Sequence, residues 1–98
     1  MYQIKQSPQF ESWLASLPDR STRIRLSRRL VRAQRGLLGD VVFVGKGVFE
    51  MREFFGPGWR MYYTFRERSL LLMLWGGNKG SQSDDVKRAI ALADFFED

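Results

Sequence analysis

The sequence predicts an α+β fold in which one layer of helices covers one face of an antiparallel sheet. Two observations predict it. Apolar residues recur at helical spacing in the first third of the chain and again near its end. Between residues 41 and 75 the chain is instead rich in β-branched and aromatic residues, with glycine turns between the runs. The expected order is a short N-terminal strand, a helical hairpin, a four-strand antiparallel meander and a C-terminal helix, in a single domain of residues 1–98.

The first elements are a short strand and a short helix. Residues 2–6 alternate in polarity and predict the strand. Ser7 and Pro8 are typical of a helix start, as the N-cap and the first helical residue, and Pro18 ends the helix. The apolar face of this helix consists of Phe10, Trp13, Leu14 and Leu17.

The second helix is predicted to begin at a cap, Asp19 or Ser21, and to run to about residue 35. Its apolar stripe consists of Leu26, Leu30, Ala33 and Leu37. At 100° per residue, five arginines gather on an adjoining band. They are Arg25, Arg28, Arg29, Arg32 and Arg35. We interpret this band as a surface for phosphate groups; the alternatives are a solvated helix face or a surface held by an acidic partner segment.

Four strands follow, joined by short turns. The expected strands are residues 41–44, 48–55, 59–65 and 69–75. Glycines flank Lys46 and Pro57 in the first two turns, and residues 66–68 make the third. Every second residue of the two middle strands points to the same face, and one such set is apolar and should face the helices. Glu53 also belongs to this set and is its misfit, expected at an edge. The apolar members of the set are Phe49, Met51, Phe55, Trp59, Met61, Tyr63 and Phe65.

A last helix closes the chain. Residues 76–80 are expected to break the strand pattern, and Ser81 is expected to cap the helix. Asp84 and Asp85 lie in its first turn, where the helix dipole favours anions. Its apolar face consists of Val86, Ala89, Ile90, Ala93 and Phe96.

Composition narrows the possible functions. Residues 1–80 carry 14 lysines and arginines against six acidic residues, whereas residues 81–98 carry two against five. A basic body suggests a polyanionic partner. The chain has no cysteine and no histidine, so thiolate chemistry is excluded and no metal site is expected. The longest apolar run, residues 70–75, is too short to span a bilayer, and no signal peptide is apparent, so we expect a cytoplasmic protein.

Several local motifs occur in an order that resembles the RelE/ParE toxin superfamily, and within it the HigB-like putative addiction-module killer proteins. The matching residues are Phe10, Trp13-Leu14, Leu17-Pro18-Asp19, Gly39-Asp40, Gly45-Lys46-Gly47-Val48, Glu50-Met51-Arg52, Gly56-Pro57-Gly58-Trp59-Arg60, Tyr62-Tyr63, Gly76-Gly77-Asn78-Lys79, Gln82, Asp85 and residues 89–93. No single motif is specific, but the ordered set spans nearly the whole chain.

The resemblance implies the toxin of a type II toxin–antitoxin system. Many members cleave mRNA in the ribosomal A site without a metal or cofactor, so the expected partners are the ribosome, mRNA and an antitoxin with a helix-turn-helix DNA-binding domain. DNA would be contacted only through that antitoxin. The arginine band and Lys46 then become candidate RNA or ribosome contacts. Two alternatives remain: a ParE-like gyrase inhibitor that acts by protein binding, and a non-catalytic relative that only binds an antitoxin.

Strand parity suggests a candidate catalytic group. Metal-free RNA cleavage needs a base, fixed cations for the phosphate and an acid for the leaving oxygen. Glu50 and Arg52 share one face of their strand, and Arg60 and Tyr62 share one face of the next. If the two faces coincide, the two arginines converge on a phosphate beside Tyr62, and Lys79 adds a third cation.

Each of these residues also has a structural interpretation. Arg52 can pair with Glu50 or Glu53 in a solvated ladder, and Arg60 can stack on Trp59. Arginine is a good phosphate clamp but a poor proton shuttle, so the general acid and base stay unassigned.

Overall fold

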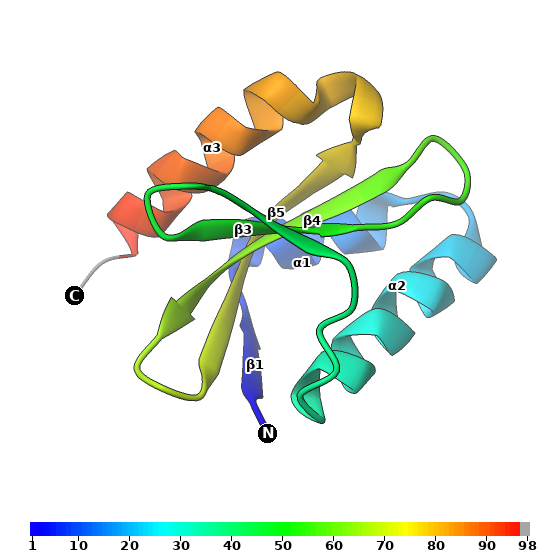
Figure 1. Cartoon of the computed structure of the whole chain (residues 1–98). Helices are drawn as coiled ribbons and strands as arrows, with labels where there is room; N and C mark the ends of the chain where they lie inside the picture. The colour runs from blue at the N-terminus through cyan, green and yellow to red at the C-terminus, as the bar shows by residue number, and fades with distance from the viewer. Residues whose placement is uncertain (97–98) are drawn as a thin grey trace.

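The computed structural model describes residues 1–96 and is an α+β fold, as the sequence predicts. A five-stranded mixed sheet is combined with three α-helices (Figure 1). In chain order the elements are β1 (Gln3–Gln6), α1 (Pro8–Ser16), α2 (Arg20–Gln34), β2 (Val41–Gly45), β3 (Val48–Arg52), β4 (Trp59–Arg66), β5 (Leu70–Asn78), the short 3-10 helix η1 (Lys79–Ser81) and α3 (Gln82–Phe95).

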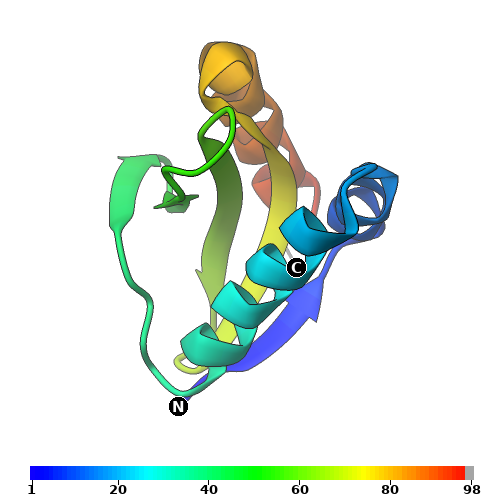
Figure 2. The ribbon, with the colours of Figure 1, turned by 90° about the vertical axis from the view of Figure 1, so that its right-hand side faces the viewer.

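The sheet has the strand order β1-β5-β4-β3-β2. Strands β2 to β5 form the expected antiparallel meander, and β1 adds to β5 in parallel, with Gln3 opposite Leu70. Figure 2 shows β1 and β2 at the two opposite edges of the sheet. Strands β4 and β5 lie inside the sheet and carry most of its buried side chains.

Helices cover both faces of the sheet, so the expected single helical layer is wrong. One core lies between α1, α2 and the face that carries Met51, Met61 and Tyr63. A second core lies on the other face, where Tyr62 and Leu74 pack against α3. Figure 1 shows α3 on one side of the sheet and α2 on the other. The apolar run of β5 explains the arrangement, because alternate residues of one strand need cover on both faces.

The helix starts follow the sequence in α1 and α2. The Ser7 hydroxyl accepts a hydrogen bond from the Phe10 amide at 3.0 Å, and Pro8 is the first helical residue. Asp19, rather than Ser21, caps α2 by accepting hydrogen bonds from the Thr22 amide and hydroxyl. Because the Thr22 hydroxyl donates to it, the pKa of Asp19 is lowered below its ordinary value.

Two strand boundaries differ from the prediction. Strand β3 ends at Arg52 instead of residue 55, and residues 53–58 form a loop in which Gly56 and Gly58 take positive φ. Strand β5 continues through Gly76 and Gly77 instead of ending at residue 75. Those two glycines pair with Met61 and Arg60 of β4, and remote side chains occupy the space that a Cβ would fill, Trp13 of α1 at Gly76 and the Asp85 carboxylate of α3 at Gly77.

The start of α3 also differs from the prediction. Asn78 is the capping side chain, and it accepts hydrogen bonds from the Gly80 and Ser81 amides at the start of η1. The Ser81 hydroxyl donates instead to Asp85. Asp85 also accepts a hydrogen bond from the Trp75 indole at 2.9 Å, so its carboxylate ties the end of β5 to α3.

Candidate functional site

The two candidate arginines lie directly opposite one another in the sheet. Strands β3 and β4 pair with Arg52 opposite Arg60 and with Glu50 opposite Tyr62. The four side chains therefore share the face predicted from strand parity, the face that α3 covers. This confirms the predicted register and brings the group together geometrically.

Arg60 is buried in an ion pair. Its Nε lies 3.7 Å from Glu50 Oε1, and both side chains are at most 5% exposed. Its Nη1 donates to the main-chain oxygens of Glu53 at 2.9 Å and Trp59 at 3.0 Å. The other oxygen of Glu50 accepts a hydrogen bond from Gln82 Nε2 of α3 at 2.9 Å. Arg60 and Glu50 thus fasten β3, β4 and the first turn of α3 together, and Glu50 does not reach solvent.

Tyr62 lies in the second core and is fully buried beneath α3. Among residues 1–96 its hydroxyl has no hydrogen-bond partner of good geometry. Burial, followed by the neighbouring Glu50 carboxylate, raises the pKa of the Tyr62 hydroxyl far above its ordinary value. The side chain therefore stays protonated at neutral pH, and it does not reach the surface at which a substrate was expected.

Two of the five candidate catalytic side chains remain accessible. Arg52 is 35% exposed and lies 3.9 Å from the half-exposed Asp40, a weak surface pair. Lys79 is exposed, and its main-chain amide donates to the Gly58 oxygen at 2.8 Å, which sets it beside the 53–58 loop. A Cβ at Gly58 would lie 3.3 Å from Lys79 Cβ and 3.6 Å from Arg60 Nη1, so these residues are close neighbours.

An exposed aromatic ring completes this surface. Phe54 is 69% exposed, and the guanidinium carbons of Arg52 and Arg60 lie 5.3 Å and 5.7 Å from its ring centre. Both distances are within the range of a cation–π contact. We call Arg52, Phe54 and Lys79 the loop-edge surface, because all three lie at the end of the sheet where the 53–58 loop turns.

Arg29 does not belong to the exposed arginine band, and its expected placement there is wrong. It is 5% exposed, pairs with Glu53, and donates to the main-chain oxygens of Leu38, Asp40 and Arg52. Glu53, the one acidic residue on the predicted apolar face, is therefore the ion-pair partner of the buried Arg29 from α2. A signal for this was present, since Arg29 follows Leu26 by three residues and precedes Ala33 by four, on the buried stripe of the helix.

The remaining arginines of the band are exposed along α2. Arg25 also places its guanidinium carbon 3.6 Å from the centre of the Phe55 ring, which joins this band to the 53–58 loop. We call this set the α2 stripe. Its members are Arg25, Arg28, Arg32 and Arg35.

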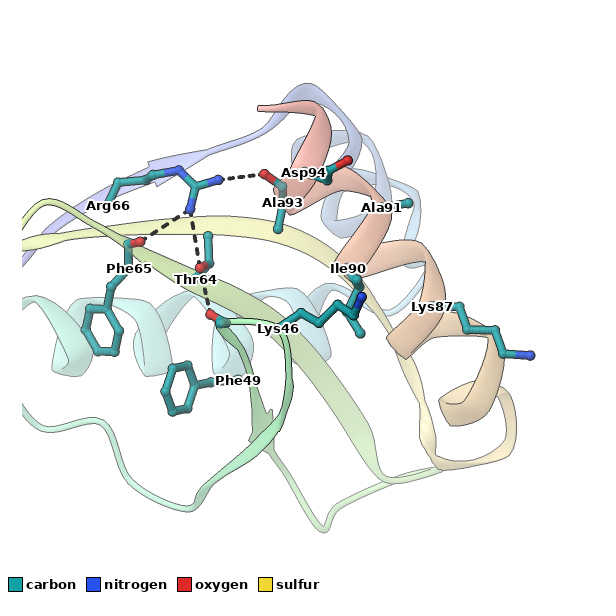
Figure 3. A pocket seen from close by; sticks show the side chains of 11 residues that line it. Lys46, Phe49, Thr64, Phe65, Arg66, Lys87, Ile90, Ala91, Ala93 and Asp94 are labelled. Atoms are coloured by element: carbon teal, nitrogen blue, oxygen red, sulfur yellow. Dashed lines mark hydrogen bonds between the residues drawn. The ribbon is translucent and has the colours of Figure 1, made fainter. Parts of the chain in front are cut away.

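Lys46 lies apart from these residues. It occupies the turn before β3, at the opposite end of that strand from Arg52. There it lines an open groove of about 860 Å³ between the β2–β3 turn and α3, together with Phe49 and Ile90. Figure 3 shows Arg66 at this groove, where its guanidinium donates to the Ala93 oxygen at 2.6 Å and ties β4 to the last turn of α3.

Within residues 1–96 no group of three or more acidic, histidine or cysteine side chains is arranged to hold a metal ion. None of the helices in that range combines the length and the apolar composition that crossing a bilayer requires.

The chain is similar to a protein of Haemophilus influenzae that is described as uncharacterized. The two are 37% identical over 91 residues, which cover 93% of this chain and 92% of the relative. The chain belongs to the family of that protein. No family model matches the chain. Because the similarity covers nearly all of both proteins, it concerns the whole fold of the family and not one motif.

For this member of the family, sequence reasoning missed three residues of the site. Gln82 holds Glu50, Asp40 faces Arg52, and the ring centre of Phe54 lies within 6 Å of the guanidinium carbons of Arg52 and Arg60. The placement of Phe54 had a sequence signal, a second aromatic residue beside a glycine-rich turn, but the hydrogen bond of Gln82 depends on how α3 docks. Chemically, the loop-edge surface offers fixed cations and an aromatic face. Glu50 and Tyr62, the expected candidates for proton transfer, are buried and do not reach this surface.

Proposed function

We propose that this protein is the HigB-like toxin of a type II toxin–antitoxin system, with a RelE-like fold, and that it inhibits translation by acting on mRNA in the ribosome. The observation that carries the proposal is the loop-edge surface, where Arg52 and Lys79 present cations to solvent beside an aromatic ring. The ordered family motifs and the basic α2 stripe support it.

In the proposed reaction the 2′-hydroxyl of one nucleotide attacks the adjacent phosphorus, and the bond to the 5′-oxygen breaks. The hydroxyl proton leaves to a base, and the departing oxygen gains a proton. The role that suits Arg52 and Lys79 is to neutralise charge on the phosphate as it becomes pentavalent. Arg60 is a positioning residue in this scheme, because its contacts to Glu53 and Glu50 set the shape of the loop that carries Phe54.

Primer extension on translated mRNA, after induced expression, tests the proposal. We expect cleavage within codons that requires ribosomes, and at least a tenfold loss of cleavage in the double variant Arg52→Ala, Lys79→Ala. The matched control removes two exposed cations from α3, Lys87→Ala with Arg88→Ala, and should leave cleavage in place. Intact mRNA and continuing translation at a high level of the protein would contradict the proposal.

A second candidate is inhibition of DNA gyrase by protein binding. The observation that favours it is the burial of Glu50, Arg60 and Tyr62, which removes most of the expected catalytic group from solvent. It predicts a supercoiling defect and toxicity that survives Arg52→Ala with Lys79→Ala. A supercoiling assay beside the primer-extension assay separates the two functions.

We also propose a cytoplasmic location and a cognate antitoxin with a helix-turn-helix domain as the partner. Edge strand β2 supports the need for a partner, because its outer residues Val42 and Phe43 are apolar and exposed. Copurification of the chain with the product of an adjacent reading frame is the corresponding test.

A further inference from the structure

Phe54 is exposed while the residues on either side of it in the chain are fixed. Glu53 pairs with buried Arg29, and its amide donates to the Trp59 oxygen at 2.9 Å. Phe55 packs against the core beneath the guanidinium of Arg25. Both neighbours are turned toward the α2 side of the sheet, whereas the ring of Phe54 lies near the guanidiniums of Arg52 and Arg60 on the other side. The residues that flank the exposed ring are therefore both fixed by contacts.

The surroundings of the ring distinguish it from other exposed phenylalanines. Two guanidiniums lie within 6 Å of its centre, and exposed Lys79 follows at the neighbouring strand end. Phe43 and Phe95 are also well exposed, but in the described range of residues 1–96 neither has a guanidinium over its ring. Cations beside Phe54 repel a basic partner and attract a ligand that carries anionic groups next to flat apolar ones.

A single-stranded nucleic acid has this combination. Each nucleotide joins a phosphate to a base whose π-face stacks on aromatic side chains, and stacking of this kind is tolerant of sequence. The partly exposed Arg52 and the exposed Lys79 suit the phosphate, and the exposed ring of Phe54 suits the base. A double helix suits the surface less well, because its bases are already stacked and its grooves present base edges.

We propose that Phe54 is a stacking platform for one unpaired base of single-stranded RNA, and that it holds the adjoining phosphate against Arg52 and Lys79. This inference rests on the proposed RNA-directed function and adds to it a residue that selects an unstacked, single-stranded substrate. It assigns Phe54 a part in binding, not in proton transfer.

Fluorescence anisotropy with the purified full-length chain tests the proposal. The probes are a short oligoadenylate and an oligomer of equal length and charge whose sugars lack bases. We expect the wild-type chain to prefer the oligoadenylate. Phe54→Ala and Phe54→Leu should lower its affinity about tenfold without changing that for the abasic oligomer. Phe54→Trp should preserve the preference, and Phe43→Ala, an exposed phenylalanine on β2, is the matched control.

The outcomes separate the inference from the function on which it rests. If the wild-type chain binds the oligoadenylate and Phe54→Ala binds equally well, the stacking role is overturned while RNA binding stands. If the wild-type chain binds neither oligomer, RNA recognition itself fails. If Phe54→Ala abolishes growth arrest but leaves RNA binding unchanged, the ring serves a protein interface and the inference is overturned. Because Phe54 is exposed, all three variants should fold, and circular dichroism checks this.

Discussion

Arg60 connects a buried ion pair with the surface for which we propose a function. Its guanidinium is nearly sequestered from water, where an unpaired charge is costly, yet it lies under the ring of Phe54 at the loop-edge surface. Glu50 balances the charge, and Gln82 fixes Glu50 in turn. The arginine therefore shapes the surface without being its main exposed cation, a role that falls to Arg52.

Removal of Arg60 should destabilise the fold much more than removal of Arg52. We expect Arg60→Ala to lower the free energy of unfolding by about 3–5 kcal/mol, because Glu50 is left buried without its partner. Arg52→Ala should cost less than about 1 kcal/mol, since its pair with Asp40 is partly exposed and long. Urea denaturation followed by circular dichroism measures both.

A double variant identifies the cause. Arg60→Met with Glu50→Gln removes both charges, so it should recover much of the stability lost in Arg60→Ala. Equal midpoints for Arg60→Ala and Arg52→Ala would show that the buried pair does not stabilise the protein.

The cap of α2 should make stability depend on pH. The pKa of Asp19 in the folded chain is lowered from 3.8, first by the hydrogen bond from Thr22. The stabilisation is therefore present above that ordinary value and is lost as the pH falls through the folded pKa. Asp19→Asn keeps a good cap without a titrating group, so the wild-type advantage over this variant should shrink between neutral pH and pH values below 3.8. Thermal melts across that range measure it, and a constant difference would contradict the assignment.

At the scale of elements, the end of β5 depends on two glycines. Gly76 and Gly77 let α1 and α3 approach the strand from opposite sides, with Trp13 against one and Asp85 against the other. This close approach places η1, and with it Lys79, beside the 53–58 loop. The position of Lys79 is therefore set by packing between three elements.

Gly77→Ala should destabilise the junction between β5 and α3. The new methyl group would overlap the Asp85 carboxylate and displace it from Trp75 and Ser81. We expect a loss of about 1–3 kcal/mol or more, as for overpacked cores. Gly80→Ala is the matched control, because its Cβ would approach only the tip of Asn78 at 3.1 Å. Differential scanning calorimetry compares the two, and equal melting temperatures would contradict this account.

Local sequence patterns predicted the helices and strands well, but they predicted the contacts between these elements less well. The caps at Ser7 and Asp19, the meander and the pairing of Arg52 with Arg60 follow from short-range rules on spacing, turns and strand parity. The continuation of β5 through Gly76 and Gly77 did not follow from them, because it depends on pairing with β4 and on packing against Trp13 and Asp85 from elsewhere in the chain. When these remote partners are unknown, a pair of glycines predicts the end of a strand.

For the molecule as a whole, the main error concerned which face each helix covers. Parity correctly separated the apolar face of Met51 and Met61 from the face of Glu50 and Arg60, but the second face was expected to be open. Because α3 covers this second face, Glu50, Arg60 and Tyr62 are buried. Of the expected catalytic residues, only Arg52 and Lys79 remain accessible. The uninterrupted apolar character of residues 70–75 was the available sign of two covered faces.

The distribution of charge over the whole molecule should appear in the salt dependence of the RNA binding that we propose. If the α2 stripe binds phosphates, Arg28→Gln with Arg35→Gln should weaken binding to oligoadenylate and abasic oligomer alike. It should also reduce the slope of log affinity against log salt by about 0.7 for each phosphate that the variant no longer neutralises. Lys87→Gln with Arg88→Gln on α3 removes the same charge and should change the slope less. Equal slopes for the two double variants would assign the effect to net charge alone.

The parallel pairing of β1 with β5 affects the order in which the chain acquires its shape. The Ser7 hydroxyl donates a hydrogen bond to the main-chain oxygen of Leu74, 67 residues further along the chain. Strand β1 is synthesised first, but it pairs in the sheet only with β5, which is synthesised last. Contacts this distant in sequence form late, because the intervening loop must close first. Until then the core beneath α1 and α2 lacks Leu71 and Met73 of β5. A nascent chain that has not yet produced β5 should therefore be a target for chaperones and proteases.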